Sequence, residues 1–116
     1  MTPDGDGRGQ SIRGDDEFAL RIDDRAGSVF VAARGDVDVE SVTAFNDGLR
    51  EAVSRTPPEV RVDLAGITFL GSEGIRSLVL AHAAAAAQGT RLMVTAASPI
   101  VRRVLTLTES DWLLGG

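Results

Sequence analysis

The chain has 116 residues, with 17 acidic side chains, 12 basic ones, a formal net charge of −5 and no cysteine. This length suits one domain with its own hydrophobic core, and the lack of cysteine excludes a disulfide framework and a thiolate metal site. Nucleic acid is not expected as a partner, because phosphate binding needs a concentrated basic face. The sequence has neither the apolar core of a signal peptide nor the about 18 consecutive apolar residues of a membrane span. We therefore expect a cytoplasmic protein that does not bind membranes.

The first part of the chain predicts a tail followed by a hairpin. Residues 1–16 are rich in glycine and aspartate and nearly free of apolar side chains, so we expect a flexible N-terminal tail. Residues 17–116 form the predicted domain. Within it, Glu17–Asp23 alternates apolar and polar residues, which is typical of a strand with one buried face. Residues 24–27 indicate a turn and Ser28–Gly35 a second strand, so the two strands are expected to pair.

A helix is predicted after the run Gly35-Asp36-Val37-Asp38, because apolar residues then recur at helical spacing. Asp38 is placed to cap this helix, which must end before Pro57. A metal site is not predicted here. Magnesium and calcium require more oxygen ligands than the carboxylates of Asp36 and Asp38 supply.

The second half of the chain predicts a βαβ unit and a final helix. Glu59–Leu64 and Thr90–Ala96 have the pattern of buried strands, and a helix running from Ser72 to about Gln88 joins them. Such units are right-handed and place their strands in parallel. Ser98 and Pro99 are typical of a helix start, as cap and first helical residue. The whole pattern predicts an α/β domain with a mixed sheet of four to five strands and about three helices packed on it.

Ser72 has two interpretations from the local sequence. As a helix cap, its hydroxyl would accept a hydrogen bond from a backbone amide, which is worth roughly 1 kcal/mol. As a phosphoacceptor, it would place a charge of about −1.5 to −2 at the positive end of the helix dipole. The local sequence favours the cap. The position itself is where ligands gather in open α/β sheets, beyond the carboxyl ends of the strands.

Catalysis by this serine is not expected. The segment Gly71–Gly74 partly matches the nucleophile elbow G-x-S-x-G, but Leu70 stands where the first glycine is required. His82 is the single histidine. It lies roughly 15 Å of helix rise beyond Ser72, too far to act as its base. The chain also has no lysine and no glycine-rich phosphate loop. We therefore predict a protein that is not an enzyme and needs no cofactor.

Two runs resemble the STAS domain of anti-sigma factor antagonists. They are VDLAGITFLGSEGIRSL at residues 62–78 and QGTRLMVTAASPIVRRVLTLT at residues 88–108. The family pattern is a strand ending in Asp-Leu, an apolar pair, Asp-Ser-(Ser/Thr)-Gly-(Leu/Ile), and a later helix start Ser-Pro-x-Val-x-(Lys/Arg). The resemblance covers Glu17 to Leu114. Gly71 replaces the aspartate of this pattern, and Glu73 replaces its small hydroxyl residue.

The resemblance implies a STAS fold and an anti-sigma factor antagonist that regulates transcription. Ser72 matches the serine that the partner phosphorylates; this partner is an anti-sigma factor with a histidine-kinase-like ATPase fold that acts as a serine kinase. The unphosphorylated form sequesters the partner and frees a sigma factor, and phosphorylation reverses this. The kinase brings ATP and Mg²⁺, and a phosphatase is a further implied partner. The expected contact residues are Asp36, Asp38, Gly71, Ser72, Glu73, Gly74 and Arg76.

A second hypothesis remains open, namely a STAS module that acts as a constitutive adaptor in a lipid-transport or signalling complex. Ser72 would then only cap its helix, so Ser72→Ala would lower stability without changing the choice of partner. A third hypothesis, a small hydrolase, requires an activity that is lost in Ser72→Ala, and we do not expect one. In the binding roles we expect a monomer or weak dimer.

Overall fold

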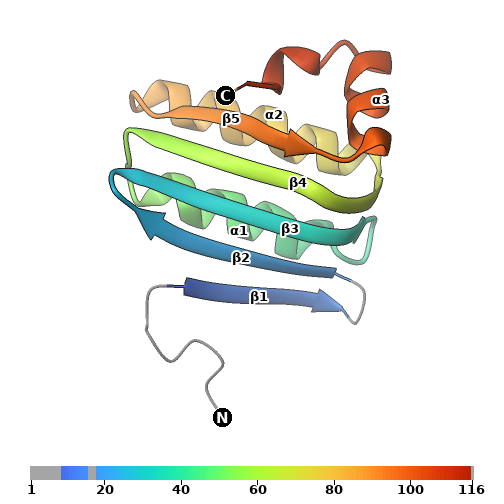
Figure 1. The fold of residues 1–116 in the computed structure, drawn as a ribbon, viewed down its shortest axis with the longest axis horizontal. Helices are drawn as coiled ribbons and strands as arrows, with labels where there is room; N and C mark the ends of the chain where they lie inside the picture. Colours follow the sequence, from blue (N-terminus) through green and yellow to red (C-terminus); the bar gives the residue numbers. More distant parts are fainter. Residues whose placement is uncertain (1–8, 16–17, 116) are drawn as a thin grey trace.

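The computed structural model describes residues 9–15 and 18–115, and its strands form one five-stranded sheet (Figure 1). The strands lie in the order of the chain and are β1 (Gly9–Asp15), β2 (Phe18–Arg25), β3 (Ser28–Val37), β4 (Glu59–Leu70) and β5 (Arg91–Ala97). β1 pairs with β2, and β2 with β3, in antiparallel fashion. β3, β4 and β5 are parallel. The predicted α/β fold with a mixed sheet is therefore confirmed.

The helices are α1 (Val42–Ser54), α2 (Ser72–Ala87) and α3 (Pro99–Leu107), followed by the short 3₁₀ helix η1 (Asp111–Leu113). α1 and α2 lie side by side on one face of the sheet, and α3 lies near the carboxyl end of β5 (Figure 1). None of the helices in the described part of the chain is long and apolar enough to cross a membrane.

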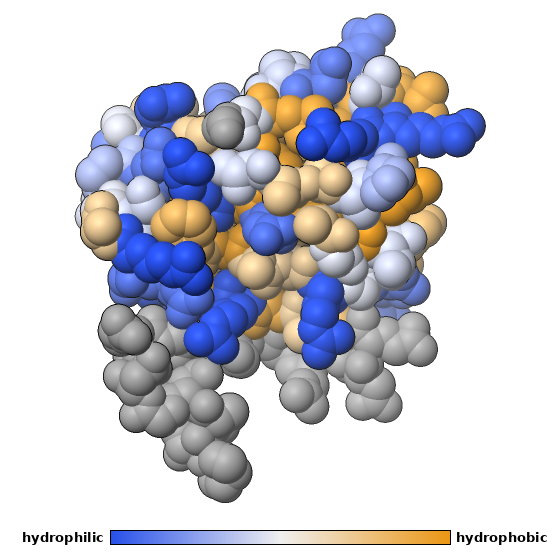
Figure 2. Space-filling model, viewed as in Figure 1, coloured by the Kyte–Doolittle hydropathy of each residue, from blue (hydrophilic) through white to orange (hydrophobic). Residues whose placement is uncertain are grey.

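The core lies between the sheet and the helices α1 and α2. The predicted alternation on β2 is present, since Phe18, Leu20 and Ile22 are buried. Phe18 meets Phe45 of α1 edge to face, with 6.3 Å between ring centroids. The other face of the sheet carries charged side chains such as Arg21, which pairs with Asp23 at 3.2 Å. Hydrophilic side chains lie across this face, with apolar ones among them (Figure 2).

The structure differs from the predicted tail, because residues 9–15 form β1 instead of a flexible segment. β1 pairs with β2 from Gly9 opposite Asp23 to Asp15 opposite Phe18. Backbone pairing along the edge of a sheet needs no apolar side chains, so a segment poor in them can still become ordered. The rest of the predicted tail, residues 1–8 and 16, lies outside the described residues.

β4 is longer than predicted and extends to Leu70 instead of Leu64. The register with β3 shifts between Ala32 and Arg34 and again between Gly35 and Asp36, as in a β-bulge. These shifts break the period of two by which a strand is recognised in sequence. The longer strand carries the chain directly to the start of α2.

The start of α3 is as predicted, with Ser98 as N-cap and Pro99 in the first turn. The Ser98 hydroxyl accepts from the Val101 amide at 3.4 Å. We expect Ser98→Ala to lower the free energy of unfolding by about 1 kcal/mol, because that amide loses its partner. Urea denaturation measures this change. Ser54→Ala on exposed α1 surface is the matched control, and equal losses in the two variants would contradict the capping role.

Candidate functional site

Ser72 is the first residue of α2 and follows β4 after one intervening residue. That residue, Gly71, is the N-cap, with φ −80° and ψ 172°, and no side chain caps the helix. The prediction that Ser72 caps the helix is therefore wrong, because the cap position falls one residue earlier, on Gly71, and Ser72 is already the first residue of the helix. Ser72 is exposed, and its hydroxyl makes no hydrogen bond to the described residues.

The end of β3 lies beside this helix start. Val37 is opposite Leu70 in the β3–β4 ladder, and the Gly71 amide donates to the Val37 carbonyl at 3.0 Å. This bond fixes the loop after β3 next to Ser72. Between them is a shallow pocket of about 350 Å³. It is lined by Val37, Asp38, Val39, Phe69, Gly71, Ser72 and Glu73.

Asp38 organises the loop between β3 and α1, but it does not cap α1. That helix begins at Val42 with Ser41 as its N-cap. The carboxylate of Asp38 accepts from the amides of Glu40 at 3.0 Å and Ser41 at 3.1 Å, and its carbonyl accepts from Val42 N at 2.9 Å. The cap position is therefore Ser41, three residues after Asp38, because Asp38–Ser41 forms a turn of its own before the helix begins. The buried Ser41 hydroxyl donates to the Asp36 carbonyl and closes the loop.

The same hydrogen bonds set the pKa of Asp38. Desolvation alone raises this pKa, but the amides of Ser41 and Glu40 and the Ser41 hydroxyl outweigh it and lower the pKa below the ordinary 3.8. Because folding lowers the pKa of Asp38, its ionised carboxylate stabilises the folded state at pH values above the ordinary pKa of 3.8. This stabilisation is lost as the pH falls through the folded-state pKa.

We therefore expect the carboxyl ¹³C signal of Asp38 to titrate with a midpoint below 3.8. Asp38→Asn identifies that signal by its absence. The same variant should be less stable than the wild type at pH 7, and the difference should shrink as the pH falls through the measured midpoint. A midpoint at or above 3.8 would show that the loop does not hold the carboxylate as described.

Asp36 lies at the end of β3, outside the lining of the pocket. Its carboxylate accepts a hydrogen bond from the Thr68 hydroxyl of β4. In the β3–β4 ladder Asp36 stands opposite Phe69, which does line the pocket. Asp36 is therefore next to the site, with its side chain bound to the neighbouring strand.

Gly74 was expected to be a contact residue, but it is buried beneath the protein's own chain. A Cβ atom at this position would lie 2.7 Å from Leu70 Cδ1 and 2.8 Å from Val37 Cγ1. Gly74 therefore lets α2 pack closely on β3 and β4, and a partner cannot reach it. Of the predicted contact residues on α2, Glu73 and Arg76 are exposed together with Ser72.

Two exposed apolar side chains at the site were not predicted. Val39 is 77% exposed and Phe69 is 49% exposed, and both line the pocket with Ser72. Phe69 continues the apolar residues that follow the predicted strand, and such residues are typically buried. The bulge turns it outward instead, so the only signal in the sequence was an apolar residue three positions before the first residue of α2. The site thus combines an exposed hydroxyl, an apolar pair and the acidic Glu73.

His82 and Ser72 do not form a nucleophile–base pair, because the imidazole packs edge to face on Trp112 at 4.8 Å between ring centroids. Within residues 9–15 and 18–115, no three acidic or histidine side chains are grouped so that they could hold a metal ion. The geometry at Ser72 is suited to contact with another protein.

Comparison with known proteins identifies the family. The family model described as "Mlab, STAS domain" matches residues 20–115. The chain belongs to the STAS domain family. This confirms the family that the sequence motifs around Ser72 and Ser98 indicated.

Individual STAS proteins are similar over most of their length. The chain is 26% identical over 96 residues to the anti-sigma-F factor antagonist RsfB of Mycobacterium tuberculosis, which covers 83% of this chain and 78% of RsfB. The crystal structure of an anti-sigma factor antagonist from Mycobacterium paratuberculosis has a TM-score of 0.77 at 27% identity, with 85% of this chain and 84% of that one covered. Unphosphorylated SpoIIAA has a TM-score of 0.71 at 15% identity, with 83% and 85% covered, and shares the fold.

Proposed function

We propose that this STAS protein is an anti-sigma factor antagonist and that Ser72 is its phosphorylation switch. In the unphosphorylated state the surface around Ser72 binds an anti-sigma factor, and the sigma factor is released for transcription. The partner is a serine kinase with a histidine-kinase-like ATPase fold, and a phosphatase restores the binding form. The protein acts in the cytoplasm and by binding alone. The observation that carries the proposal is the exposed Ser72 hydroxyl, free of internal hydrogen bonds, at the start of α2.

The surroundings of Ser72 support both states of the switch. A phosphate on Ser72 would lie at the N-terminus of a 16-residue helix, whose dipole favours negative charge there. The modification would therefore leave α2 folded. The apolar side chains of Val39 and Phe69 lie beside the hydroxyl and offer the buried centre that a protein contact requires.

Phosphorylation would oppose that contact. A dianionic group next to Val39 and Phe69 loses its hydration when a partner covers them, and an unpaired charge is costly to bury. Glu73 adds a second negative charge in the first turn of α2. A partner that covers this surface must therefore already offset the charge of Glu73, and a phosphate on Ser72 would add further negative charge beside it.

The remaining predicted contact residues take separate roles in this proposal. Asp38 holds the loop that presents Val39, through its bonds to Glu40 and Ser41. Arg76 is exposed one turn beyond Ser72 and makes no ion pair with the described residues, so it can bind an acidic group of the partner. Gly71 remains a contact residue at the pocket.

A phosphotransfer assay tests the proposal. The purified protein is incubated with ATP, Mg²⁺ and each histidine-kinase-like serine kinase encoded in the same genome, and the phosphorylated residue is mapped by mass spectrometry. We expect phosphate on Ser72, none in Ser72→Ala, and unchanged labelling in the control Ser54→Ala on α1. If no kinase labels the protein, or if phosphate appears at another residue, the switch at Ser72 is refuted.

The departures from the family pattern favour one alternative, a constitutive STAS adaptor in a lipid-transport or signalling complex. Gly71 and Glu73 stand where antagonists carry an aspartate and a small hydroxyl residue, and Glu73 already gives the surface negative charge. An adaptor would bind its partner equally well with serine or aspartate at position 72. Because Ser72 is not the helix cap, Ser72→Ala should leave stability nearly unchanged under either function.

A further inference from the structure

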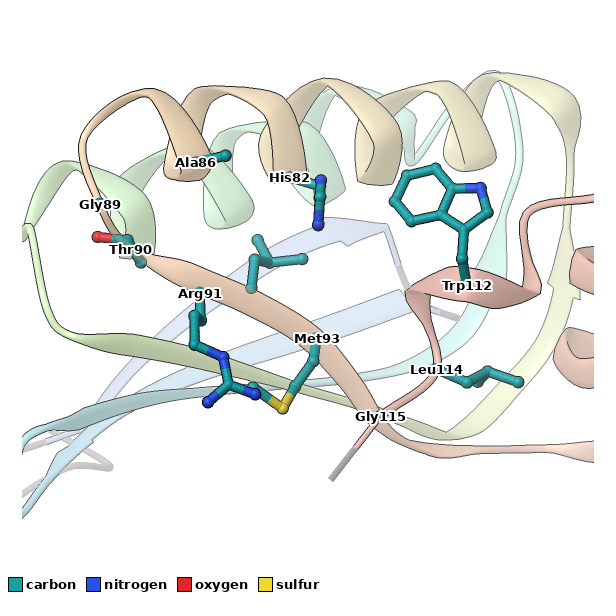
Figure 3. Close-up of a pocket in the computed structure, with 10 residues that line it drawn as sticks. His82, Ala86, Gly89, Thr90, Arg91, Met93, Trp112, Leu114 and Gly115 are labelled. Atoms are coloured by element: carbon teal, nitrogen blue, oxygen red, sulfur yellow. The ribbon is translucent and has the colours of Figure 1, made fainter.

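A groove of about 460 Å³ lies at the far end of α2 from Ser72. Its walls are the C-terminal half of α2, the first residues of β5 (Arg91–Met93) and the segment Trp112–Gly115 (Figure 3). α2 has 16 residues, so a rise of about 1.5 Å per residue separates its two ends by roughly 24 Å. The groove is therefore a separate feature from the surface around Ser72. We call it the β5 groove.

The floor of the β5 groove is the free edge of the sheet. The Arg91 amide donates to the Pro58 carbonyl, so Arg91 and, two residues on, Met93 direct their backbone groups towards β4. In a parallel ladder, the residues that alternate with these direct their amide and carbonyl groups away from the neighbouring strand. The Leu92 amide and carbonyl consequently face the groove, and no described residue pairs with them. Such unpaired edge groups are a template for another strand.

The chain itself shows that this edge accepts a strand. Leu114 forms a parallel bridge with Val94, and the Gly115 amide donates to the Val94 carbonyl at 2.9 Å. Among the described residues, this pairing involves Val94 of β5 and leaves Leu92 uncovered. Gly115 lies against the side chain of Met93, so a second segment can pair with the Leu92 backbone beside Arg91 without displacing the one already bound.

The side chains on the two sides of this edge differ in character. On the side of α2, the groove presents the rings of His82 and Trp112, and Trp112 is 53% exposed. On the opposite side of β5, the side chains of Arg91 and Met93 extend away from those rings (Figure 3). Successive side chains of an added strand would point alternately to the two sides. One side suits an apolar residue and the other a carboxylate.

The charge of Arg91 selects the occupant. Its side chain is exposed and has no ion pair with a described residue. Across the β4–β5 ladder it faces Glu59 and attracts its carboxylate, but that carboxylate makes its hydrogen bonds to Arg61 at 2.9 Å and to Ser28 at 3.1 Å. A second copy of this chain would bring two Arg91 side chains to one edge, and like charges on neighbouring strands are unfavourable.

We propose that the β5 groove binds an extended acidic segment of a partner protein by adding it as a strand beside β5. The Leu92 backbone supplies the hydrogen bonds, His82 and Trp112 receive an apolar side chain, and Arg91 pairs with a carboxylate. Main-chain bonding gives such peptide contacts their affinity, and alternate side-chain pockets give them their specificity. The proposal does not depend on phosphorylation of Ser72.

Two peptides test the charge preference, Ac-Glu-Val-Glu-Val-Glu-NH₂ and Ac-Lys-Val-Lys-Val-Lys-NH₂. They are titrated to millimolar concentration into the ¹⁵N-labelled full chain, with Trp112, the only tryptophan, as a fluorescent reporter. We expect saturable shifts at Leu92 and Trp112, with the acidic peptide binding about fivefold more tightly. Arg91→Ala should remove this preference, whereas Arg103→Ala on α3 should keep it. No shifts at Leu92, or equal affinity for the two peptides, would overturn the proposal.

Backbone methylation tests the strand pairing. Only alternate amides of an added strand face β5, so methylating either the valine or the glutamate amides should abolish binding in one peptide and leave it in the other. Equal binding of both methylated peptides would refute strand addition. Analytical ultracentrifugation of the free chain adds a second check, since a dimer that Arg91→Ala strengthens would assign the edge to a second copy and refute the proposal.

Discussion

Ser72→Asp is expected to weaken binding of the anti-sigma factor partner by roughly tenfold to a hundredfold, or about 1.4 to 2.7 kcal/mol. The new carboxylate would be exposed at the start of α2, beside the apolar side chains of Val39 and Phe69. When a partner covers these side chains, the carboxylate must lose water without gaining a counter-ion. Isothermal titration calorimetry with the kinase that labels the protein measures the effect.

Two variants separate this effect from nonspecific charge and from lost contacts. Ser54→Asp adds the same charge to an exposed position on α1 and should leave the affinity unchanged. Ser72→Ala removes the hydroxyl without adding charge and should bind within a few-fold of the wild type. If Ser72→Asp binds as tightly as the wild type, the adaptor function is favoured and the switch is wrong.

Gly74→Val is expected to lower the free energy of unfolding by about 3 kcal/mol, because it overpacks the junction of α2 with the sheet. A Cβ atom at Gly74 would approach Leu70 Cδ1 to 2.7 Å and Val37 Cγ1 to 2.8 Å. Helix propensity acts in the opposite direction, since valine is a better helix former than glycine. A measured loss in the free energy of unfolding would therefore be caused by the overpacking and not by helix propensity. Urea denaturation followed by circular dichroism gives the value.

Ala83→Val on the exposed side of α2 is the matched control and should cost no more than about 0.7 kcal/mol. The same experiment tests the site, because the clash displaces α2 from Val37, whose carbonyl holds the Gly71 amide. We expect a folded fraction of Gly74→Val to bind the partner more weakly than Ala83→Val. Equal stability of the two variants would show that Gly74 is not needed for this close approach.

The elements that the sequence predicted well are those whose burial follows one simple period. Phe18, Leu20 and Ile22 alternate with polar residues, and the hairpin they predict is present. The β4–α2–β5 unit also follows from its apolar runs, and Gly89 ends α2 with a φ of 85°, as a glycine at that position should. Ser98 and Pro99 marked the start of α3 correctly.

The parts that the sequence could not predict depend on contacts between distant segments. β1 is formed by backbone pairing with β2. This pairing does not require apolar side chains on β1, so the sequence of β1 does not indicate it. The bulge between β3 and β4 exposes Phe69 and carries the strand to Leu70, which makes Gly71 the helix cap instead of Ser72. Gly74 is buried because Val37, far away in the sequence, lies against it. Only the fold brings these residues together.

The dissociation constant of one partner for two forms of the protein is the most direct measurement of the proposed switch. One form carries unmodified Ser72, and the other carries phosphoserine incorporated at position 72 during synthesis, so no kinase is needed to prepare it. We predict that the phosphorylated form binds at least tenfold more weakly while its circular dichroism spectrum is unchanged. Equal dissociation constants for the two forms would contradict the proposal that charge on Ser72 controls the partner.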